Sequence, residues 1–110
     1  MSLIDIQKDV DAWVTQFKVE YFKPLEMIAA MAEELGELSR EVNNRYGPRT
    51  KKSHQDTADI SQEISDMIFA LVCLANLHNI NLDESWKKKM DKQYGRDSNR
   101  FERKDEQNGQ

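Results

Sequence analysis

The sequence predicts an all-α protein, an antiparallel bundle of four helices whose core is completed by oligomerisation. Only two prolines and four glycines interrupt its 110 residues, and no stretch alternates apolar and polar residues as a half-buried strand would. Apolar residues instead recur at spacings of three and four, which place them on one face of a helix. The composition, 38% hydrophobic and 33% charged, is typical of a helical protein with a densely charged surface.

The first helix is expected to begin after Ser2, which together with Asp5 has the pattern of a capping box. Its apolar residues recur with helical periodicity, and this spacing favours core packing over base stacking for Trp13 and Phe17. The periodic residues are Ile6, Val10, Trp13, Val14 and Phe17.

A second helix is expected to start at Pro24, because proline is favoured at the first helical position, and to end near residue 44. The sequence NNRYGP stops this helix and opens a polar and basic loop, residues 45–56. Within the loop we interpret Arg49, Lys51 and Lys52 as solvated residues rather than as a cover over a triphosphate.

A third helix is expected from about residue 57 to residue 78. The fourth helix has Asn81 as its N-cap with Glu84 three residues later, and it continues to about residue 94. Trp86 is expected to pack this helix onto its neighbours. The domain therefore spans residues 1–94, and the polar residues 95–110 are expected to form a mobile tail.

Two lines of residues with helical spacing run along the second helix. The apolar line is expected to be core and comprises Leu25, Ile28, Ala32, Leu35, Ser39 and Val42. The other line turns from apolar to acidic and comprises Met27, Ala30, Glu34, Glu37 and Glu41. The third helix has the reverse order, in Asp59, Glu63, Asp66, Ala70, Cys73 and Leu77. Because helices joined by a short loop usually pack antiparallel, the two acidic stretches are expected to meet.

Converging carboxylates repel one another, so either their pKa values rise or a cation binds between them. The acids Glu34, Glu37, Glu63 and Asp66 suit a hard divalent ion such as Mg²⁺, with Mn²⁺ as a substitute, because such ions prefer oxygen ligands. The Glu-x-x-His motif of di-iron bundles is absent from the sequence. Spacing alone leaves a solvated acidic face as an equal alternative to a metal site.

The sequences EELGE and EISD follow the pattern EExxE … ExxD. The longer stretches YFKPLEMIAAMAEELGELSREVNNRYGP and EISDMIFALVCLANLHNINLDES extend the match over nearly the whole chain. On these residues the chain resembles the small single-domain MazG-like nucleotide pyrophosphohydrolases, which are all-α. The resemblance implies a homodimer or homotetramer that hydrolyses nucleoside triphosphates, NTP or dNTP, to monophosphate and pyrophosphate with Mg²⁺, as nucleotide-pool housekeeping.

The motif also implies roles for individual residues. Metal ligands are implied at Glu34, Glu37, Glu63 and Asp66, while Glu33 is implied to orient the site or a water. Glu33 and Glu37 are the catalytic candidates for accepting a proton from that water. In relatives a basic residue of the last helix meets the phosphates, which implies Lys89, and the further substrate-binding candidates are Tyr94 and Arg96.

Two other functions stay open on the sequence alone. One is a pyrophosphohydrolase of the same fold acting on another substrate, such as phosphoribosyl-ATP, and the other is a non-catalytic helical interaction module. The net charge of -4 disfavours a nucleic-acid partner. The longest apolar run, residues 67–75, is far below the roughly 20 residues of a membrane span. With one cysteine and an N-terminus without an apolar signal core, a cytoplasmic protein is expected.

Overall fold

Four α-helices account for most of the described chain. The computed structural model describes residues 1–47 and 53–104, with backbone only for residues 53–59. The helices are α1 (Leu3–Val14), α2 (Pro24–Tyr46), α3 (Ser53–Leu77) and α4 (Leu82–Tyr94), followed by a short 3-10 helix, η1 (Asp97–Arg100). No strand occurs within the described ranges, which confirms the all-α class.

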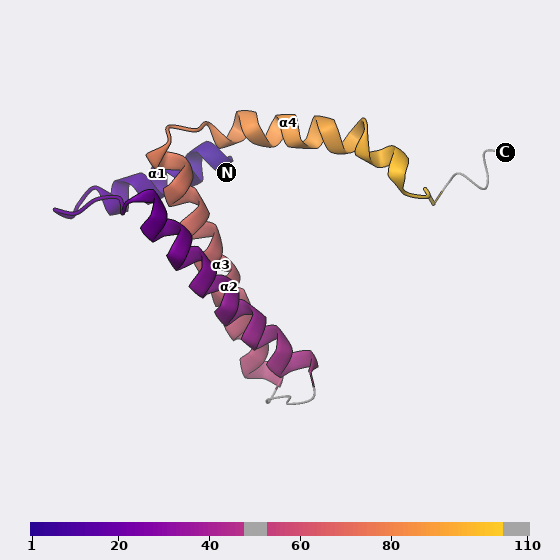
Figure 1. Cartoon of the computed structure of the whole chain (residues 1–110), viewed down its shortest axis with the longest axis horizontal. Coiled ribbons are helices and arrows are strands. Elements are labelled where there is room, and N and C mark those ends of the chain that lie inside the picture. The colour runs from indigo at the N-terminus through magenta and orange to yellow at the C-terminus, as the bar shows by residue number, and fades with distance from the viewer. Residues whose placement is uncertain (48–52, 105–110) are drawn as a thin grey trace.

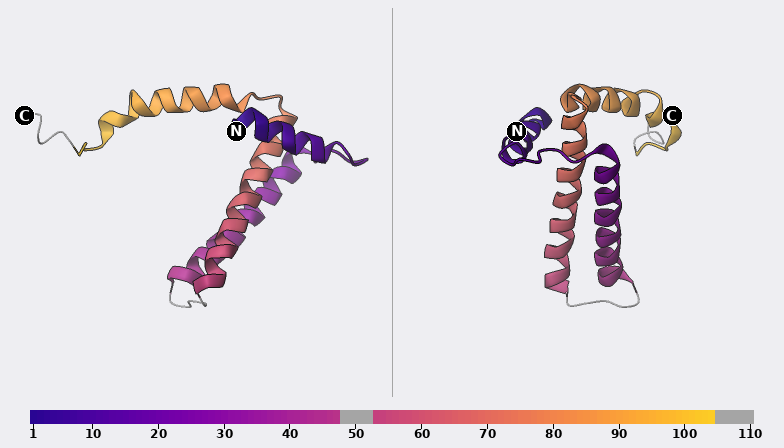
Figure 2. Two further views of the ribbon diagram at one scale, coloured as in Figure 1. Left: turned by 180° about the vertical axis from the view of Figure 1, so that it is seen from behind. Right: turned by 60° about the vertical axis from the view of Figure 1, so that its left-hand side comes forward.

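The two long helices, α2 and α3, form an antiparallel hairpin and provide the most extensive helix contact in the chain. They lie side by side along their lengths in both views of Figure 2. Because they run in opposite directions, the C-terminal half of α2 faces the N-terminal half of α3. This is the arrangement in which the two acidic stretches were expected to meet.

The short helix α1 crosses the end of the hairpin where α2 begins and α3 ends (Figure 1). The buried core sits at this crossing and consists of Val10, Val14, Met27, Val72 and Cys73. Each helix of the crossing contributes to it, so α1 closes one end of the hairpin. The acidic half of the hairpin lies outside this core.

Helix α4 extends away from the hairpin instead of packing along it (Figure 1). Trp86 is 57% exposed, so the expectation that it packs α4 onto its neighbours is wrong for the described chain. The Cα radius of gyration is 18.4 Å, well above the roughly 13 Å of a compact chain of about this length. One chain therefore leaves α4 without the cover that a closed bundle would give it.

Local sequence signals set the helix starts. Ser2 and Asp5 form the predicted capping box, with each side chain accepting a backbone N–H of the other residue at 3.2 Å and 3.0 Å. Pro24 occupies the first turn of α2, and the Asn81 side chain accepts the backbone N–H of Glu84. These three predictions are confirmed.

Helix ends agree less closely with the sequence. Helix α2 continues to Tyr46, two residues past the expected end, and α3 begins at Ser53, before the expected residue 57. Part of the expected tail is ordered as η1. Phe101 is 72% exposed and therefore does not anchor the described part of the tail.

The apolar line of α2 that was expected to be core faces outward, and that prediction is wrong for a single chain. Leu25 is 83% exposed and Leu35 is 54% exposed. The outer side of α3 is apolar as well, since Ile64, Ile68 and Leu71 are each nearly half exposed. The acidic line of α2 faces α3 instead, with Met27 and Glu41 buried. The hairpin therefore presents an apolar outer face and encloses its acids.

An 18-residue stretch of α3, Ile60–Leu77, is long and apolar enough to pass for a membrane span. The core helix of a soluble protein meets the same criterion. Two acids of this stretch, Glu63 and Asp66, are half-buried, and intramembrane acids are costly unless they are compensated. The stretch is therefore weak evidence for a membrane.

Candidate functional site

Carboxylates from both helices of the hairpin converge at its middle. One oxygen each from Glu34, Glu37 and Glu63 lies within 4.8 Å of the other two. The two glutamates of α2 are three residues apart and so share one helix face, while Glu63 comes from α3. All three side chains are half-buried. The convergence predicted from the sequence is therefore present in the fold for these three residues.

Burial and the close approach of these acids raise the pKa values of two of them, Glu34 and Glu63. Burial, repulsion from Glu37 and a hydrogen bond with Glu37 raise the pKa of Glu63 to about 7. The pKa of Glu34 is also raised, first by burial and then by repulsion from Glu37 and Asp66, although a hydrogen bond with Glu63 partly opposes this. Two carboxyl groups can hydrogen-bond each other only if one carries a proton. Without a cation, Glu63 is therefore about half protonated near pH 7.

The donor set fits a hard divalent cation. The Oε2 atoms of Glu34 and Glu63 are inaccessible to solvent and have no hydrogen-bond partner among the described residues. A buried carboxylate oxygen without a partner is costly, and a metal ion is one way to satisfy it. Only oxygen ligands are present in this group, which matches the preference of Mg²⁺ and Mn²⁺ over softer metals.

The other predicted acids lie around this group. Asp66 is not one of the three converging residues, but it lies close enough to raise the pKa of Glu34 and of Glu63. Glu33 is exposed on α2 beside Glu34. Glu41, farther along the same face of α2, is only 8% exposed, and its Oε2 has no hydrogen-bond partner in the described part of the chain. The buried acidic face thus continues past the cluster.

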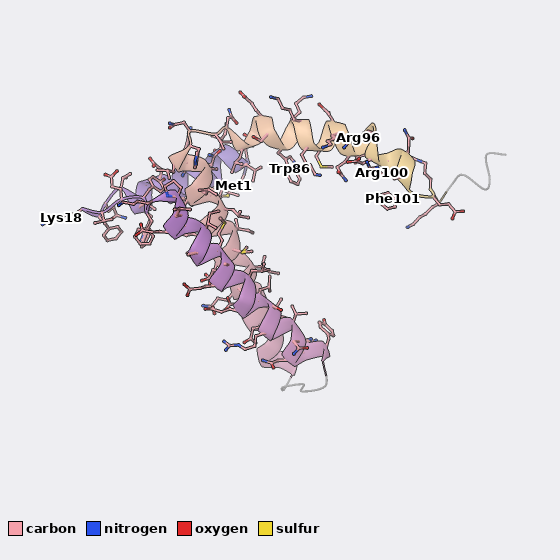
Figure 3. All side chains as sticks on the ribbon, viewed as in Figure 1. Met1, Lys18, Trp86, Arg96, Arg100 and Phe101 are labelled. Atoms are coloured by element: carbon pink, nitrogen blue, oxygen red, sulfur yellow. The ribbon has the colours of Figure 1, made fainter. Side chains whose placement is uncertain are left out.

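The predicted substrate-binding residues do not meet the acids within one chain. Lys89 and Tyr94 lie on α4 and Arg96 follows it, so all three lie on the arm that points away from the hairpin (Figure 3). The Lys89 ammonium donates to Gln93 at 2.9 Å, and the Arg96 guanidinium pairs with Asp97 at 3.2 Å. The loop residues Arg49, Lys51 and Lys52 lie outside the described residues.

An apolar cavity of about 580 Å³ adjoins the acids, between α1, the connection to α2, and the two hairpin helices. Glu34 and Asp66 line it together with three aromatic side chains, Trp13, Phe17 and Phe69. Trp13 lies edge-on to Phe17, with ring centroids 4.9 Å apart, and edge-on to Phe69, with centroids 5.8 Å apart. Trp13 and Phe17 are 55% and 49% exposed, so their predicted core packing is wrong.

Hydrogen bonds fix one wall of this cavity. The Tyr21 hydroxyl donates to Asp11 at 2.7 Å and accepts from the Asn76 amide at 2.9 Å. The Asn76 side chain also accepts a hydrogen bond from the side-chain amide of Gln7 and donates one to the backbone carbonyl of Gln7. Burial, and after it the bond to Asp11, raises the pKa of Tyr21 to about 12. The network ties the connection after α1 to the C-terminal end of α3.

The sequence reasoning gave the aromatic cavity no role. Trp13 and Phe17 have helical spacing, which indicates a core position, but α1 ends at Val14 and Phe17 lies beyond it. The available signal was a cluster of aromatic residues on both sides of a helix end, Trp13, Phe17, Tyr21 and Phe22. The sequence placed Glu41 on the acidic line but did not predict that its side chain is buried.

Three comparisons agree on the family. Residues 22–101 match the sequence model of the MazG nucleotide pyrophosphohydrolase domain. YpjD of Bacillus subtilis (strain 168) is 50% identical over 105 residues, which are 96% of this chain and 95% of that protein. The crystal structure of YPJD from Bacillus subtilis superposes with a TM-score of 0.77 at 49% identity, covering 84% of this chain and 94% of that one.

A second crystal structure is described as that of the Bacillus-conserved MazG protein, a nucleotide pyrophosphohydrolase. It superposes with a TM-score of 0.73 at 41% identity and covers 84% of this chain and 88% of that chain. The matched residues 22–101 include both hairpin helices and thus all the converging acids. The chain therefore belongs to the MazG nucleotide pyrophosphohydrolase family, whose members are hydrolases acting on nucleotide phosphoanhydrides.

Proposed function

We propose that this protein is a Mg²⁺-dependent, cytoplasmic hydrolase that converts nucleoside triphosphates, NTP or dNTP, to monophosphate and pyrophosphate. The observation that carries the proposal is the convergence of Glu34, Glu37 and Glu63 at the middle of the hairpin. Membership of a family of nucleotide pyrophosphohydrolases supplies the reaction class. An acidic cluster in which the pKa values of Glu34 and Glu63 are raised, and which lies beside an open cavity, is also typical of an active site.

The acids of the hairpin are the proposed ligands of the Mg²⁺ ion. Glu34, Glu37 and Glu63 would hold one ion, and Asp66, which lies close to them, is the fourth proposed ligand. Bound Mg²⁺ would neutralise charge on the phosphates and lower the pKa of a coordinated water, and Mn²⁺ would substitute for it. Cations also remove the mutual repulsion that raises the proton affinity of Glu63.

The reaction adds one water across the anhydride between the α and β phosphates. The water's oxygen bonds to phosphorus, the bridging oxygen leaves with pyrophosphate, and a carboxylate accepts the water's proton. Glu33 and Glu37 are the proposed proton acceptors. Glu37 lies within the converging group, whereas Glu33 is exposed beside it and is free to orient a water.

The proposed active form is a homodimer or homotetramer. Exposed apolar side chains on the outer side of both hairpin helices need cover, and Leu35 and Ile68 lie on this face with 54% and 47% exposure. In such an assembly the arm formed by α4 is available to bring Lys89, Tyr94 and Arg96 to the acids of another copy. This accounts for the separation of these residues from the acids within one chain.

Product analysis by ³¹P NMR tests the proposed function. The wild type with Mg²⁺ is expected to yield nucleoside monophosphate and pyrophosphate from a panel of NTPs and dNTPs. The variant Glu37→Gln keeps the shape of the side chain but loses its charge, and it is expected to lose turnover while retaining its helical circular dichroism. The exposed acid Asp9, changed to Asn, is the matched control. Diphosphate and orthophosphate as products, or full turnover by Glu37→Gln, would refute the proposal.

A further inference from the structure

Glu41 is a buried acid to which the converging group gives no role. Its side chain is 8% exposed, and its Oε2 atom is inaccessible to solvent and has no hydrogen-bond partner among the described residues. Arg45, one turn further along α2, therefore donates no hydrogen bond to this oxygen. A buried carboxylate oxygen without a partner costs free energy unless a proton or a cation satisfies it. Glu41 thus requires a compensating group.

The ion proposed for the converging group does not reach Glu41. Glu34 and Glu41 are seven residues apart, which is about 10.5 Å along the helix at about 1.5 Å per residue. Two oxygens bound to one Mg²⁺ ion are at most about 4.2 Å apart, because each lies about 2.1 Å from the metal. Glu41 accordingly does not belong to the three residues whose oxygens lie within 4.8 Å of one another.

Glu37 lies between the two positions on the same face of α2. It is three residues after Glu34 and four residues before Glu41, and both spacings place side chains on adjacent turns of one helix face. Residues four apart have their Cβ atoms about 5–6 Å from each other, a separation that two carboxylates can span through one ion. Because a carboxylate has two oxygens, Glu37 can offer one to the converging group and the other to an ion shared with Glu41.

The charge between α2 and α3 exceeds what one divalent ion compensates. Five acids, when ionised, carry five negative charges there: Glu34, Glu37, Glu41, Glu63 and Asp66. One divalent cation leaves three of these charges uncompensated, and two cations leave one. Paired metal ions in enzymes that cleave phosphate bonds lie about 3.5–4 Å apart, which is a distance that one bridging carboxylate spans.

We infer that the hairpin holds a second divalent cation, bound by Glu41 together with Glu37, beside the ion of the converging group. The inference rests on the proposed function for that first ion, and it adds a ligand outside the EExxE … ExxD pattern. Water completes the coordination, since Mg²⁺ usually keeps several waters. The second cation satisfies the Glu41 oxygen that the described side chains leave without a partner.

Mn²⁺ stoichiometry and electron paramagnetic resonance test the inference. Equilibrium dialysis at saturating Mn²⁺ is expected to give two ions per chain for the wild type and one for Glu41→Gln. Two Mn²⁺ ions about 3.5–4 Å apart couple magnetically, so the wild type is expected to show a spin-coupled spectrum and Glu41→Gln the spectrum of an isolated ion. Asp9→Asn, which removes an exposed acid of α1, is the control and is expected to bind two coupled ions.

Thermal melts separate the loss of a ligand from damage to the fold. Glu41→Gln keeps the shape of the side chain and buries no unpaired charge, so the metal-free variant is expected to be at least as stable as the metal-free wild type. Saturating Mn²⁺ is expected to raise the Tm of Glu41→Gln less than that of the wild type, because an ion that binds only the folded chain stabilises it.

The outcomes distinguish the second ion from the proposed hydrolysis. One isolated Mn²⁺ per chain in a wild type that has turnover overturns the inference and leaves the proposed function intact. Two coupled ions that persist in Glu41→Gln also overturn the inference, because Glu41 is then not a ligand. Two coupled ions in the wild type and one in Glu41→Gln, in a protein that releases no pyrophosphate from any nucleoside triphosphate, support the inference and refute the proposed function.

Discussion

The raised pKa of Glu63 predicts how metal affinity depends on pH. Metal binding requires ionised carboxylates, so any proton on Glu63 competes with the ion. With a pKa of about 7, Glu63 is about one-tenth ionised at pH 6 and about nine-tenths ionised at pH 8. The affinity for Mn²⁺ is therefore expected to rise by about tenfold between these pH values from this one group, and the raised pKa of Glu34 adds to the effect.

Isothermal titration of Mn²⁺ into the metal-free protein at pH 6, 7 and 8 measures this dependence. Glu63→Gln removes the titrating group, so its affinity is expected to be weaker at pH 8 and to change less with pH. Asp9→Asn removes an exposed carboxylate on α1 and is expected to behave as the wild type. An affinity that stays constant from pH 6 to 8, or Glu63→Gln binding as tightly as the wild type at pH 8, would refute the reasoning.

Three further predictions follow from burial and charge. Raised carboxyl pKa values mean that the folded chain binds more protons than the unfolded one, so thermal melts of the metal-free protein should show stability falling as pH rises from about 4.5 to about 7; rising stability would contradict this. Sedimentation velocity should show a dimer or tetramer that Leu35→Glu dissociates and the control Lys8→Glu does not; a monomeric wild type at micromolar concentration would contradict the oligomer. Tyr21→Phe should lower the free energy of unfolding by about 1 kcal/mol in chemical denaturation, because it removes a partner from both Asp11 and Asn76; an unchanged value would mean that the network does not hold the wall.

Local signals were sufficient to predict where the helices begin. A capping side chain or an N-terminal proline acts within one turn, so Ser2, Pro24 and Asn81 could be assigned from their immediate neighbours. The convergence of Glu34 and Glu63 followed from helix periodicity and an antiparallel hairpin. Helix periodicity depends on residues three or four apart, and the antiparallel hairpin depends on the short connection between neighbouring helices.

The orientation of the hairpin's faces could not be predicted in the same way. Apolar periodicity normally marks the inward face, but in α2 the acidic line containing Glu37 and Glu41 faces α3, while Leu35 faces outward. In the proposed function, cations would compensate the enclosed acids and other copies of the chain would cover the apolar face. Neither contribution is encoded in the local pattern of one chain.

The direction of α4 could not be predicted from the sequence either. Residues 79–81 turn the chain, and Asn79 adopts a left-handed conformation with φ of 54°. Leu82 and Asp83 then hydrogen-bond to Gln7 and Leu3 of α1, and these contacts between distant segments set the course of the helix. Trp86 has apolar character that suggests packing, but it lies on the arm that extends away from the hairpin and is 57% exposed.

Anomalous diffraction from crystals grown with Mn²⁺ tests the central claim most directly. The claim is that α2 and α3 bring their acids together to hold a divalent cation. A peak of anomalous density coordinated by oxygens of Glu34, Glu37 and Glu63 is the predicted result. Crystals at saturating Mn²⁺ with no anomalous density among these three carboxylates would contradict it.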